Sequence, residues 1–388
     1  MKPATRPRDP RSAAKLLVID DHGISHRWRA ELPLLVAAGD LVVANDAATL
    51  PSSLTGVHLR SGTPIEVRLA GRSSLDPSDV RHFTAVVFGG GDFHIDTERR
   101  EHPSSLEPGD RLQLGPIGAT VARLLDHARL VRLRFDGTPG TIWEAIARHG
   151  RQIQYSHVAE PLAIRDTWTR IAAQPVAFEP PSAGFLLTWS MLRALRARGA
   201  GFAAITHAAG ISSTGDSELD RRLPFDEPYD IPAETATMIA RTKAAGGRVI
   251  AIGTTVVRAL EDAAEPGGHV RPGPGVATRR LGPHTQVRVV DAIVSGIHEP
   301  GSSHYELLRA FRDDERLQQM TAQAAARGYQ SHEFGDSVWV TRRRRRADAG
   351  ASCDPHFPGE LRVVLEERLL AGEFGGSRLH DAFGIGRP

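Results

Sequence analysis

The residues best suited to binding chemistry lie in the stretch GGRVIAIGTTVVRALEDAA (246–264), where an apolar strand is followed by a glycine turn and a helix. Gly253 permits a tight turn. Thr254 and Thr255 stand where a helix N-terminus presents unpaired N–H groups, and Arg258 follows one turn later on a face that can reach the same ligand. The pattern predicts either a small-ligand site or an ordinary threonine cap followed by an exposed arginine that contributes little to stability.

Other polar residues with possible chemical roles lie in segments that follow strands or precede helices. Ser182, in EPPSAGF (179–185), comes just before a helix expected from about Leu186, where it can cap the helix or bind an anion. His207, in ITHAAG, ends an expected strand, and ligands of open α/β sheets bind beyond the carboxyl ends of strands. A histidine that only satisfies structural contacts explains His207 equally well.

Two later segments add carboxylate, imidazole and hydroxyl groups. Glu227, in LPFDEPYDIP, falls on an expected proline-flanked loop, where a solvated acid is the ordinary interpretation. His298, Ser302 and Ser303, in SGIHEPGSSH (295–304), lie between an expected buried strand and a helix. The chain has no G-x-S-x-G segment before a helix, so its serines do not resemble a hydrolase nucleophile elbow.

Composition narrows the class of protein that positions these residues. The chain has 388 residues, 40% of them apolar and 24% charged, which fits a globular protein of more than one domain without a membrane span. A single cysteine, Cys353, excludes an intramolecular disulfide and argues against structural zinc. The N-terminus is basic and polar, unlike a signal peptide. We therefore expect a cytoplasmic, metal-independent monomer.

The order of apolar segments predicts an α/β fold with an open sheet covered by helices. Strands are expected at 16–20, 41–45, 202–206, 249–252, 286–294 and 337–341, and helices near 29–38, 188–198, 232–245, 255–264, 304–311 and 315–327. Between residues 54 and 155 short strands alternate with Gly, Pro and Asp, including ARLVRLRFDGTPGTI (128–142), which is typical of a small β-barrel.

These segments define three predicted parts of the chain. Residues 1–53 and 156–341 form a discontinuous α/β domain, and residues 54–155 form an inserted β-barrel. Residues 342–388 form an appendage that begins with five consecutive arginines, Arg342 to Arg346, and contains an expected helix at 359–371. The arginine run is either a solvated tail or a phosphate-contacting segment.

Several long segments, taken in order, resemble the S-adenosylmethionine:tRNA ribosyltransferase-isomerases of queuosine biosynthesis. GDLVVAND (39–46) is similar to the family's GDLLVxND, and GGRVIAIGTTVVRALE (246–261) to GGRVxAVGTTxxRxLE. VRVVDAIVSGIHEPGSSHYELLRAF (287–311) resembles FxVVDxLxTNFHLPxSTLLMLVxAF, and YQSHEFGDSVWV (329–340) resembles YRFFSYGDAMLI. The resemblance covers about residues 15–341 and implies a large α/β domain with an inserted barrel.

The resemblance also implies an activity and a set of site residues. The activity is transfer and isomerisation of the ribosyl group of S-adenosylmethionine, used as co-substrate, onto a 7-aminomethyl-7-deazaguanine base in tRNA, without a metal. By their match to family motifs, the implied catalytic residues are Glu227, His298 and His207. The implied binding residues are Gly253, Thr254, Thr255, Arg258, Ser182, Ala183, Gly184 and Ser302. Ser303 is the alternative to Ser302 for the family's motif serine.

This chain also departs from the family pattern at positions expected to face the site. The family's NDTRVIPARL reads NDAATLPSSL (45–54) here, PLPPYI has become QIQYSHV (152–158), and neither histidine of HxMHxE is present. Loss of arginines weakens affinity for nucleic acid. Two alternatives to the family reaction therefore stay open: a divergent enzyme that acts on S-adenosylmethionine or a related nucleoside with a small-molecule acceptor, and an inactive binding protein.

Overall fold

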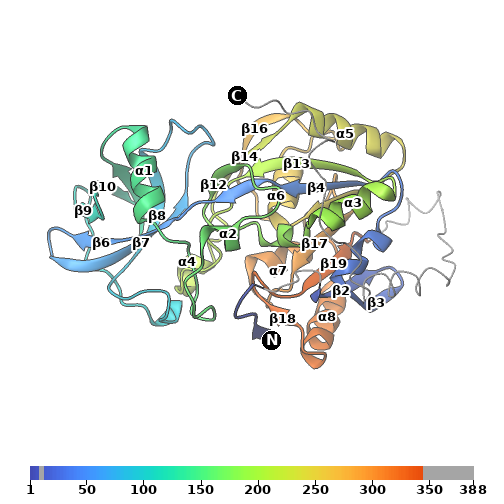
Figure 1. The fold of residues 1–388 in the computed structure, drawn as a ribbon, viewed down its shortest axis with the longest axis horizontal. Coiled ribbons are helices and arrows are strands. Elements are labelled where there is room, and N and C mark those ends of the chain that lie inside the picture. The colour runs from blue at the N-terminus through green and yellow to red at the C-terminus, as the bar shows by residue number, and fades with distance from the viewer. Residues whose placement is uncertain (8–12, 344–388) are drawn as a thin grey trace, which may run out of the picture. The chain divides into compact units, whose positions relative to one another are not determined.

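The fold is a mixed α/β arrangement that contains a nine-stranded sheet and a closed six-stranded β-barrel, in a computed structural model that describes residues 1–7 and 13–343. Figure 1 shows the barrel strands β6 to β10 grouped apart from the sheet strands β4, β13 and β17. The predicted fold class is confirmed.

The nine-stranded sheet has the order β16-β14-β13-β4-β15-β17-β19-β2-β3. Its central strands β13, β4, β15 and β17 are parallel neighbours, so their carboxyl ends meet at one edge, where ligands of such sheets bind. The strands are β2 (Lys15–Asp20), β3 (Gly23–Trp28), β4 (Leu41–Asn45), β13 (Gly201–His207), β14 (Glu227–Ile231), β15 (Val249–Ile252), β16 (Gly273–Ala277), β17 (Ala292–Gly296) and β19 (Ser337–Thr341).

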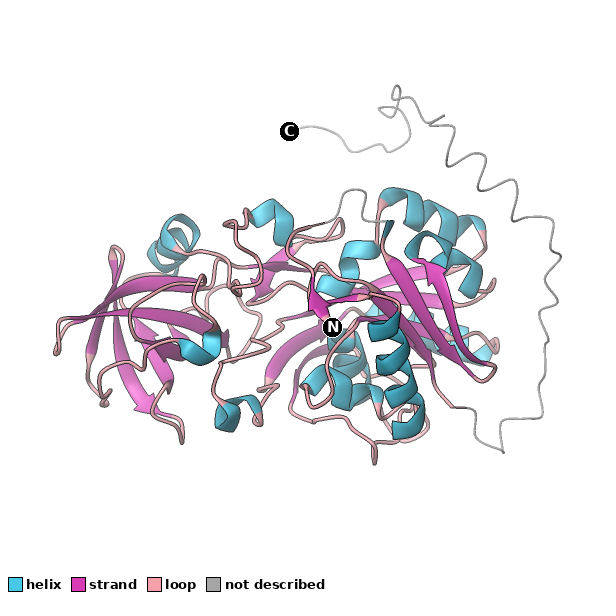
Figure 2. Ribbon diagram, turned by 90° about the horizontal axis from the view of Figure 1, so that it is seen from below, coloured by secondary structure: helices cyan, strands magenta, loops and turns pink. Residues whose placement is uncertain are grey.

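Helices cover both faces of this sheet because its central strands are apolar on both sides. Val249 and Ala251 of β15 belong to one core cluster, and Ile250 and Ile252 to another. The first cluster includes α5 (Ala233–Ala244), α6 (Thr254–Asp262), α7 (Ser303–Leu308) and α8 (Asp314–Ala326); the second includes the 3-10 helices η2 (Arg29–Leu35) and η4 (Ser182–Leu186) and helix α3 (Trp189–Ala197). Figure 2 shows helices against the sheet strands.

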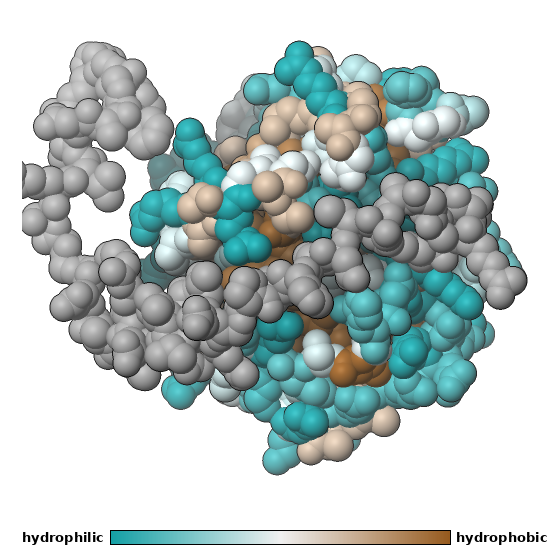
Figure 3. Space-filling view, turned by 90° about the vertical axis from the view of Figure 1, so that its right-hand side faces the viewer, coloured by the Kyte–Doolittle hydropathy of each residue, from teal (hydrophilic) through white to brown (hydrophobic). Residues whose placement is uncertain are grey.

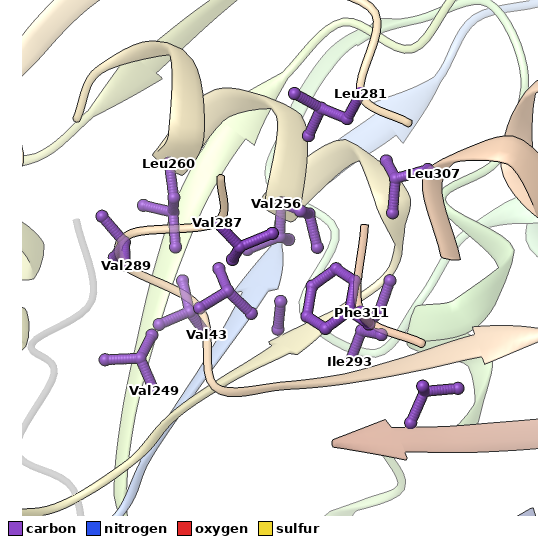
Figure 4. Packing of buried hydrophobic residues seen from close by; sticks show 14 of the residues in the cluster. Val43, Val249, Val256, Leu260, Leu281, Val287, Val289, Ile293, Leu307 and Phe311 are labelled. Carbon is purple, nitrogen blue, oxygen red and sulfur yellow. The ribbon is translucent and has the colours of Figure 1, made fainter. Parts of the chain in front are cut away.

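Helix α6 is fixed against the sheet by its apolar face. Val256 and Leu260 lie one turn apart on α6 and point toward Val43 of β4, and Phe311 packs beside Ile293 of β17 (Figure 4). All of these side chains are buried, at 2% exposure or less. Burial of side chains of this size contributes about 1.5–3 kcal/mol each, which holds the start of α6 in one place at the sheet edge.

The barrel closes through the order β10-β11-β8-β7-β6-β9, with β10 and β9 also paired. Phe83 fills its interior and meets the edges of Phe135 and Phe178, with ring centroids 5.7 and 6.2 Å away. Its strands are β6 (Ser53–His58), β7 (Thr63–Gly71), β8 (His82–Phe88), β9 (Arg111–Leu114), β10 (Ile117–Leu124) and β11 (Leu130–Phe135). These strands span residues 53–135, so the first begins one residue before the predicted insertion, whose domain bounds stay a prediction.

Short elements complete the described chain. They are β1 (Lys2–Pro3) paired with β18 (Gln330–Ser331), β5 (Ala47–Thr49) paired with β12 (Gln174–Ala177), η3 (Thr97–Arg99), α1 (Pro139–His149), α2 (Ile164–Thr167) and α4 (Ser217–Asp220). None of the helices in the described residues is long and apolar enough to cross a bilayer.

Two expected strands are wrong in part. Residues 139–142 start helix α1 and do not extend a barrel strand, because Thr138 caps the helix and Pro139 occupies its first position, where a missing N–H costs nothing. The strand expected at 286–294 begins only at Ala292. The N–H groups of Val289 and Val290 donate instead to the Glu261 carboxylate of α6, each at 2.9 Å, so this backbone is satisfied without strand pairing.

The described part of the arginine run is engaged in ion pairs. Arg342 pairs with Asp291 at 3.0 Å and Arg343 with Asp313 at 3.6 Å. The other three arginines and the helix expected at 359–371 lie outside the described residues. In Figure 3 the visible face is mainly hydrophilic, with apolar residues in small separate areas.

Candidate active site

A pocket opens at the carboxyl edge of the parallel strands, as the topology predicts. Its walls come from the segment after β12, the loop after β13, the start of β14, the start of α6, the end of β17 and helix α7. The polar residues that line it are Glu179, Ser182, Ser212, Glu227, Thr254, Thr255, Arg258, Ser295, His298, Ser303 and His304.

The glycine turn positions the N-terminus of α6 at this pocket. Gly253 has a φ of 99°, a conformation that side chains rarely adopt, and its N–H donates to Val294 O at 2.8 Å. A Cβ at this position would approach the Ala183 Cβ to 3.3 Å. Thr254 and Thr255 follow at the pocket wall. The side-chain amide of Asn45, at the end of β4, donates to Thr255 Oγ1 at 3.4 Å, and this bond links the end of β4 to the first turn of α6.

Glu227 and Arg258 form a buried ion pair in the pocket wall. Arg258 Nη1 contacts Glu227 Oε2, and Arg258 Nη2 donates to the carbonyl oxygens of Ala277 at 2.9 Å and Phe225 at 3.2 Å. Glu227 Oε1 accepts from the N–H of Gly210 at 2.6 Å. These contacts fix both side chains and leave them facing the pocket.

This pair corrects two expectations. Glu227 is the first residue of β14 and not a solvated loop acid, and Arg258 is not an exposed arginine; each is only 5% exposed. Desolvation disfavours a buried charge unless an opposite charge accompanies it. The burial of Glu227 is therefore explained by its pairing with Arg258, and the burial of Arg258 by its pairing with Glu227. Burial raises the pKa of Glu227, and the charge of Arg258 opposes that rise.

His207 lies behind the ion pair and does not line the pocket. Its ring is fully buried, with Nε2 3.4 Å from Glu227 Oε2, and neither ring nitrogen makes a hydrogen bond within residues 1–7 and 13–343. Burial, and then the charge of Arg258, lower the pKa of His207 from 6.5 to about 3. The imidazole is therefore neutral at neutral pH.

His207 should make the folded state sensitive to acid. Below pH 6.5 the unfolded chain takes up a proton on this histidine while the folded chain does not until about pH 3, so stability is lost as the pH falls between these values. The slope is about 1.4 kcal/mol per pH unit, or about 2 kcal/mol at pH 5. Urea unfolding at pH 5 to 8 measures it, and His207→Leu should reduce the slope by this amount. An unchanged slope in the variant would assign the acid sensitivity to other groups.

His298 is the pocket imidazole closest to the end of β17. Its Nε2 lies 3.3 Å from Ser295 Oγ, and its ring stacks on that of His304, with centroids 4.3 Å apart and planes at 11°. Desolvation, and then the neighbouring His304 and His332, lower the pKa of His298 well below 6.5. Desolvation and Arg258 lower the pKa of His304 to about 4. Both imidazoles are thus neutral and can accept protons.

A second carboxyl group, that of Glu179, also lines the pocket. Glu179 Oε1 accepts from the Tyr155 hydroxyl at 2.5 Å and from the N–H of Ser212 at 3.1 Å. Burial raises the pKa of Glu179. The pocket therefore combines two carboxyl groups, one guanidinium and two neutral imidazoles.

The structure brings together most, but not all, of the residues expected at the site. Ser182, Ala183, Gly253, Thr254, Thr255, Arg258, Glu227 and His298 line the pocket, as does Ser303. Ser302 is instead the N-cap of α7: its Oγ accepts from the N–H of Tyr305 at 3.2 Å. Gly184 is buried beside Thr169, where a Cβ would approach the threonine methyl to 2.9 Å.

Four polar lining residues were missed in the sequence: Glu179, Ser212, Ser295 and His304. Glu179 opens the EPPSAGF segment and His304 closes SGIHEPGSSH, so both lay within segments already chosen. Ser295 precedes His298 by three residues. The signal for His304 was its place in the first turn of a helix after His298, but the stacking of the two rings depends on the angle between β17 and α7, which local pattern does not give.

Known proteins are similar to this chain along most of its length. The family model described as "Queuosine biosynthesis protein" matches residues 2–340. The S-adenosylmethionine:tRNA ribosyltransferase-isomerase of Thermosynechococcus vestitus is 32% identical over 343 residues, which cover 87% of this chain and 92% of that protein. The enzyme of the same name from Acidiphilium cryptum is 31% identical over 351 residues, covering 87% and 95%. The crystal structure of S-adenosylmethionine tRNA ribosyltransferase from Thermotoga maritima is 22% identical, with a TM-score of 0.45, covering 87% of this chain and 95% of that one.

Proposed function

Because this chain belongs to the queuosine biosynthesis protein family, we propose that it is an S-adenosylmethionine:tRNA ribosyltransferase-isomerase. In this reaction the ribosyl group of S-adenosylmethionine is transferred to a 7-aminomethyl-7-deazaguanine base in tRNA and isomerised, giving epoxyqueuosine with loss of adenine and methionine. The observation that supports it best is that His298, the Glu227–Arg258 pair and the N-terminus of α6 line one pocket.

His298 is the residue we propose as the general base. The reaction requires removal of a proton from the carbon next to the sulfonium, and a base must be unprotonated and in contact with the substrate. His298 meets both conditions, because its ring is neutral and faces the pocket. The hydroxyl of Ser295, 3.3 Å from His298 Nε2, orients the ring.

The charges of the pocket suit the parts of S-adenosylmethionine. The first N–H groups of a helix and its dipole attract anions, so the start of α6, with the hydroxyls of Thr254 and Thr255, suits the methionyl carboxylate. The sulfonium is a cation, and Glu179 and Glu227 supply carboxyl groups in the pocket wall. A cation nearby favours the ionised form of Glu179, which burial alone disfavours.

One position of this chain bears on the acceptor. Ala48 stands where the family pattern has an arginine, and it is fully buried in β5, so this position presents no cation to a phosphate. A small-molecule acceptor is therefore the alternative, and with such an acceptor turnover would not require tRNA.

We expect adenine and methionine to be released from S-adenosylmethionine only when tRNA that carries the aminomethyl precursor base is present. The measurement is chromatography of products from S-adenosylmethionine labelled in the ribosyl group, with the label appearing in tRNA. The matched control is the same tRNA with unmodified guanine, which should give no release.

Two other outcomes would change the assignment. Equal release without any tRNA would assign a small-molecule acceptor. Calorimetry that detects no binding of S-adenosylmethionine to the purified chain would remove the basis of both enzymatic functions and favour a binding protein for another ligand.

A further inference from the structure

Three potential metal ligands from two distant segments of the chain come together outside the pocket lining. His157 lies after the barrel, and His332 and Glu333 lie between β18 and β19. One donor atom from each residue can be chosen so that all three lie within 4.8 Å of one another. We propose that His157, His332 and Glu333 bind one divalent transition-metal ion, with Zn²⁺ as the cation of best fit.

One distance in this cluster matches the spacing of two atoms bound to the same metal ion. His157 Nε2 lies 3.4 Å from Glu333 Oε2, and this nitrogen is buried without a hydrogen-bond partner in the described chain. Bonds to zinc of about 2.0–2.2 Å at a tetrahedral angle place two ligand atoms about 3.3 Å apart. The observed separation is thus close to one edge of a zinc tetrahedron, and an ion there would coordinate the His157 nitrogen, which makes no hydrogen bond within the described residues.

The third ligand completes an accessible site. The rings of His157 and His332 have centroids 4.4 Å apart. The His157 and Glu333 side chains are 12% and 19% exposed, whereas His332 is exposed and gives an ion a path of entry. Two imidazoles and one carboxylate favour Zn²⁺ or a similar first-row ion over Mg²⁺ or Ca²⁺, which prefer all-oxygen ligands. Three protein ligands leave a position for water.

All three ligands stand where this chain departs from the family pattern. His157 lies in QIQYSHV (152–158), which replaces PLPPYI, a segment without histidine. His332 and Glu333 lie in YQSHEFGD (329–336), where the pattern YRFFSYGD has phenylalanine and serine at these two places. Side chains changed in two segments far apart in sequence therefore form one cluster, as a shared ligand would require. The expectation of a metal-free chain was drawn from its single cysteine, and this site uses no thiolate.

The proposed site adjoins the candidate active site. Tyr155, two residues before His157, donates to the pocket residue Glu179 at 2.5 Å. A Cβ built on the pocket residue Gly296 would lie 3.9 Å from the carbonyl oxygen of His332. An ion that joins the two segments would hold two parts of the pocket wall together. The proposal does not depend on which acceptor the pocket uses.

Titration of the full chain with Co²⁺ tests this proposal, because Co²⁺ can take the place of Zn²⁺ and absorbs visible light when its coordination number is low. The protein is purified without an affinity tag and stripped of metal with a chelator. We expect one equivalent of Co²⁺ to produce saturable absorption that one equivalent of Zn²⁺ displaces, and Zn²⁺ to raise the melting temperature. Absence of a saturable one-to-one complex would overturn the proposal.

Variants assign the binding to these residues. Each of three variants, His157→Ala, His332→Asn and Glu333→Gln, should weaken Zn²⁺ binding at least about tenfold. Each of them removes a metal ligand, either a neutral imidazole nitrogen or an ionised carboxylate oxygen. Asparagine suits position 332, where φ is 67°, so this variant should remain folded. The matched control is His94→Ala, which removes an exposed histidine 2.8 Å from Asp92, and it should bind Zn²⁺ as the parent does. Equal affinity in all variants would show that the ion binds elsewhere among the 17 histidines.

Discussion

Replacement of Arg258 by alanine should lower the free energy of unfolding by about 3–5 kcal/mol, because it leaves the carboxylate of Glu227 buried without its partner. Both side chains are 5% exposed, and the guanidinium also donates to two backbone carbonyls that would lose their donors. Urea denaturation followed by circular dichroism at pH 7.5 measures the change. The control Arg241→Ala removes an exposed arginine of α5 and should change stability by less than about 0.5 kcal/mol.

A double variant separates the unpaired charge from lost packing. Arg258→Met with Glu227→Gln removes both charges, keeps an oxygen that can accept from Gly210, and should recover most of the lost stability. If the double variant is as unstable as Arg258→Ala, the destabilisation comes from packing and the backbone contacts. A loss as small as that of Arg241→Ala would show that this ion pair does not stabilise the fold.

The effect of Arg258→Ala should also depend on pH in a defined direction. The charge of Arg258 is one of the causes that lower the pKa of His207, whose Nε2 is 3.4 Å from Glu227 Oε2. Without the guanidinium, His207 can take up a proton and become the partner of Glu227. The destabilisation should therefore shrink as the pH falls from 8 to 6, whereas a loss caused by packing alone would not change.

Much of the fold was predictable because its central strands carry a strong local signal. Residues 41–45 and 249–252 are apolar runs that only a strand buried on both faces explains well, and both form central strands of the sheet. Three strands at or next to the sheet edges, β3, β14 and β16, were missed. β3 has no buried residue and so carries no apolar run, whereas β14 and β16 contain Pro or Gly and pair with each other across residues 232–272. Periodicity is weak evidence for such strands.

The candidate site shows the same division between local and distant signals. The turn at Gly253 was recognised from the order of strand, glycine and helix, and the structure places it at the pocket. The burial of Glu227 was not recognised from the sequence, because its environment depends on Arg258 from α6 and Gly210 from the loop after β13. A carboxylate between prolines looks exposed in the sequence unless its partner is known.

His298→Gln should lower turnover by about 100-fold to 10,000-fold, the range expected when a general base is removed, without a comparable change in the affinity for S-adenosylmethionine. Glutamine keeps a polar side chain near Ser295 Oγ but cannot act as the base. Single-turnover kinetics and calorimetry with the same protein separate the two effects. A loss below tenfold would mean that another group removes the proton.

His304→Gln provides the matched comparison, because His304 lines the same pocket and stacks on His298 without being the proposed base. Burial and His304 both lower the pKa of His298, so the parent protein should lose kcat/KM on the acid side only well below pH 6.5. Removing His304 takes away one of these causes. The variant should therefore keep most of its turnover at pH 8, while its acid limb moves up toward pH 6.5. If His304 were the base instead, His304→Gln would lose turnover at every pH and His298→Gln would not.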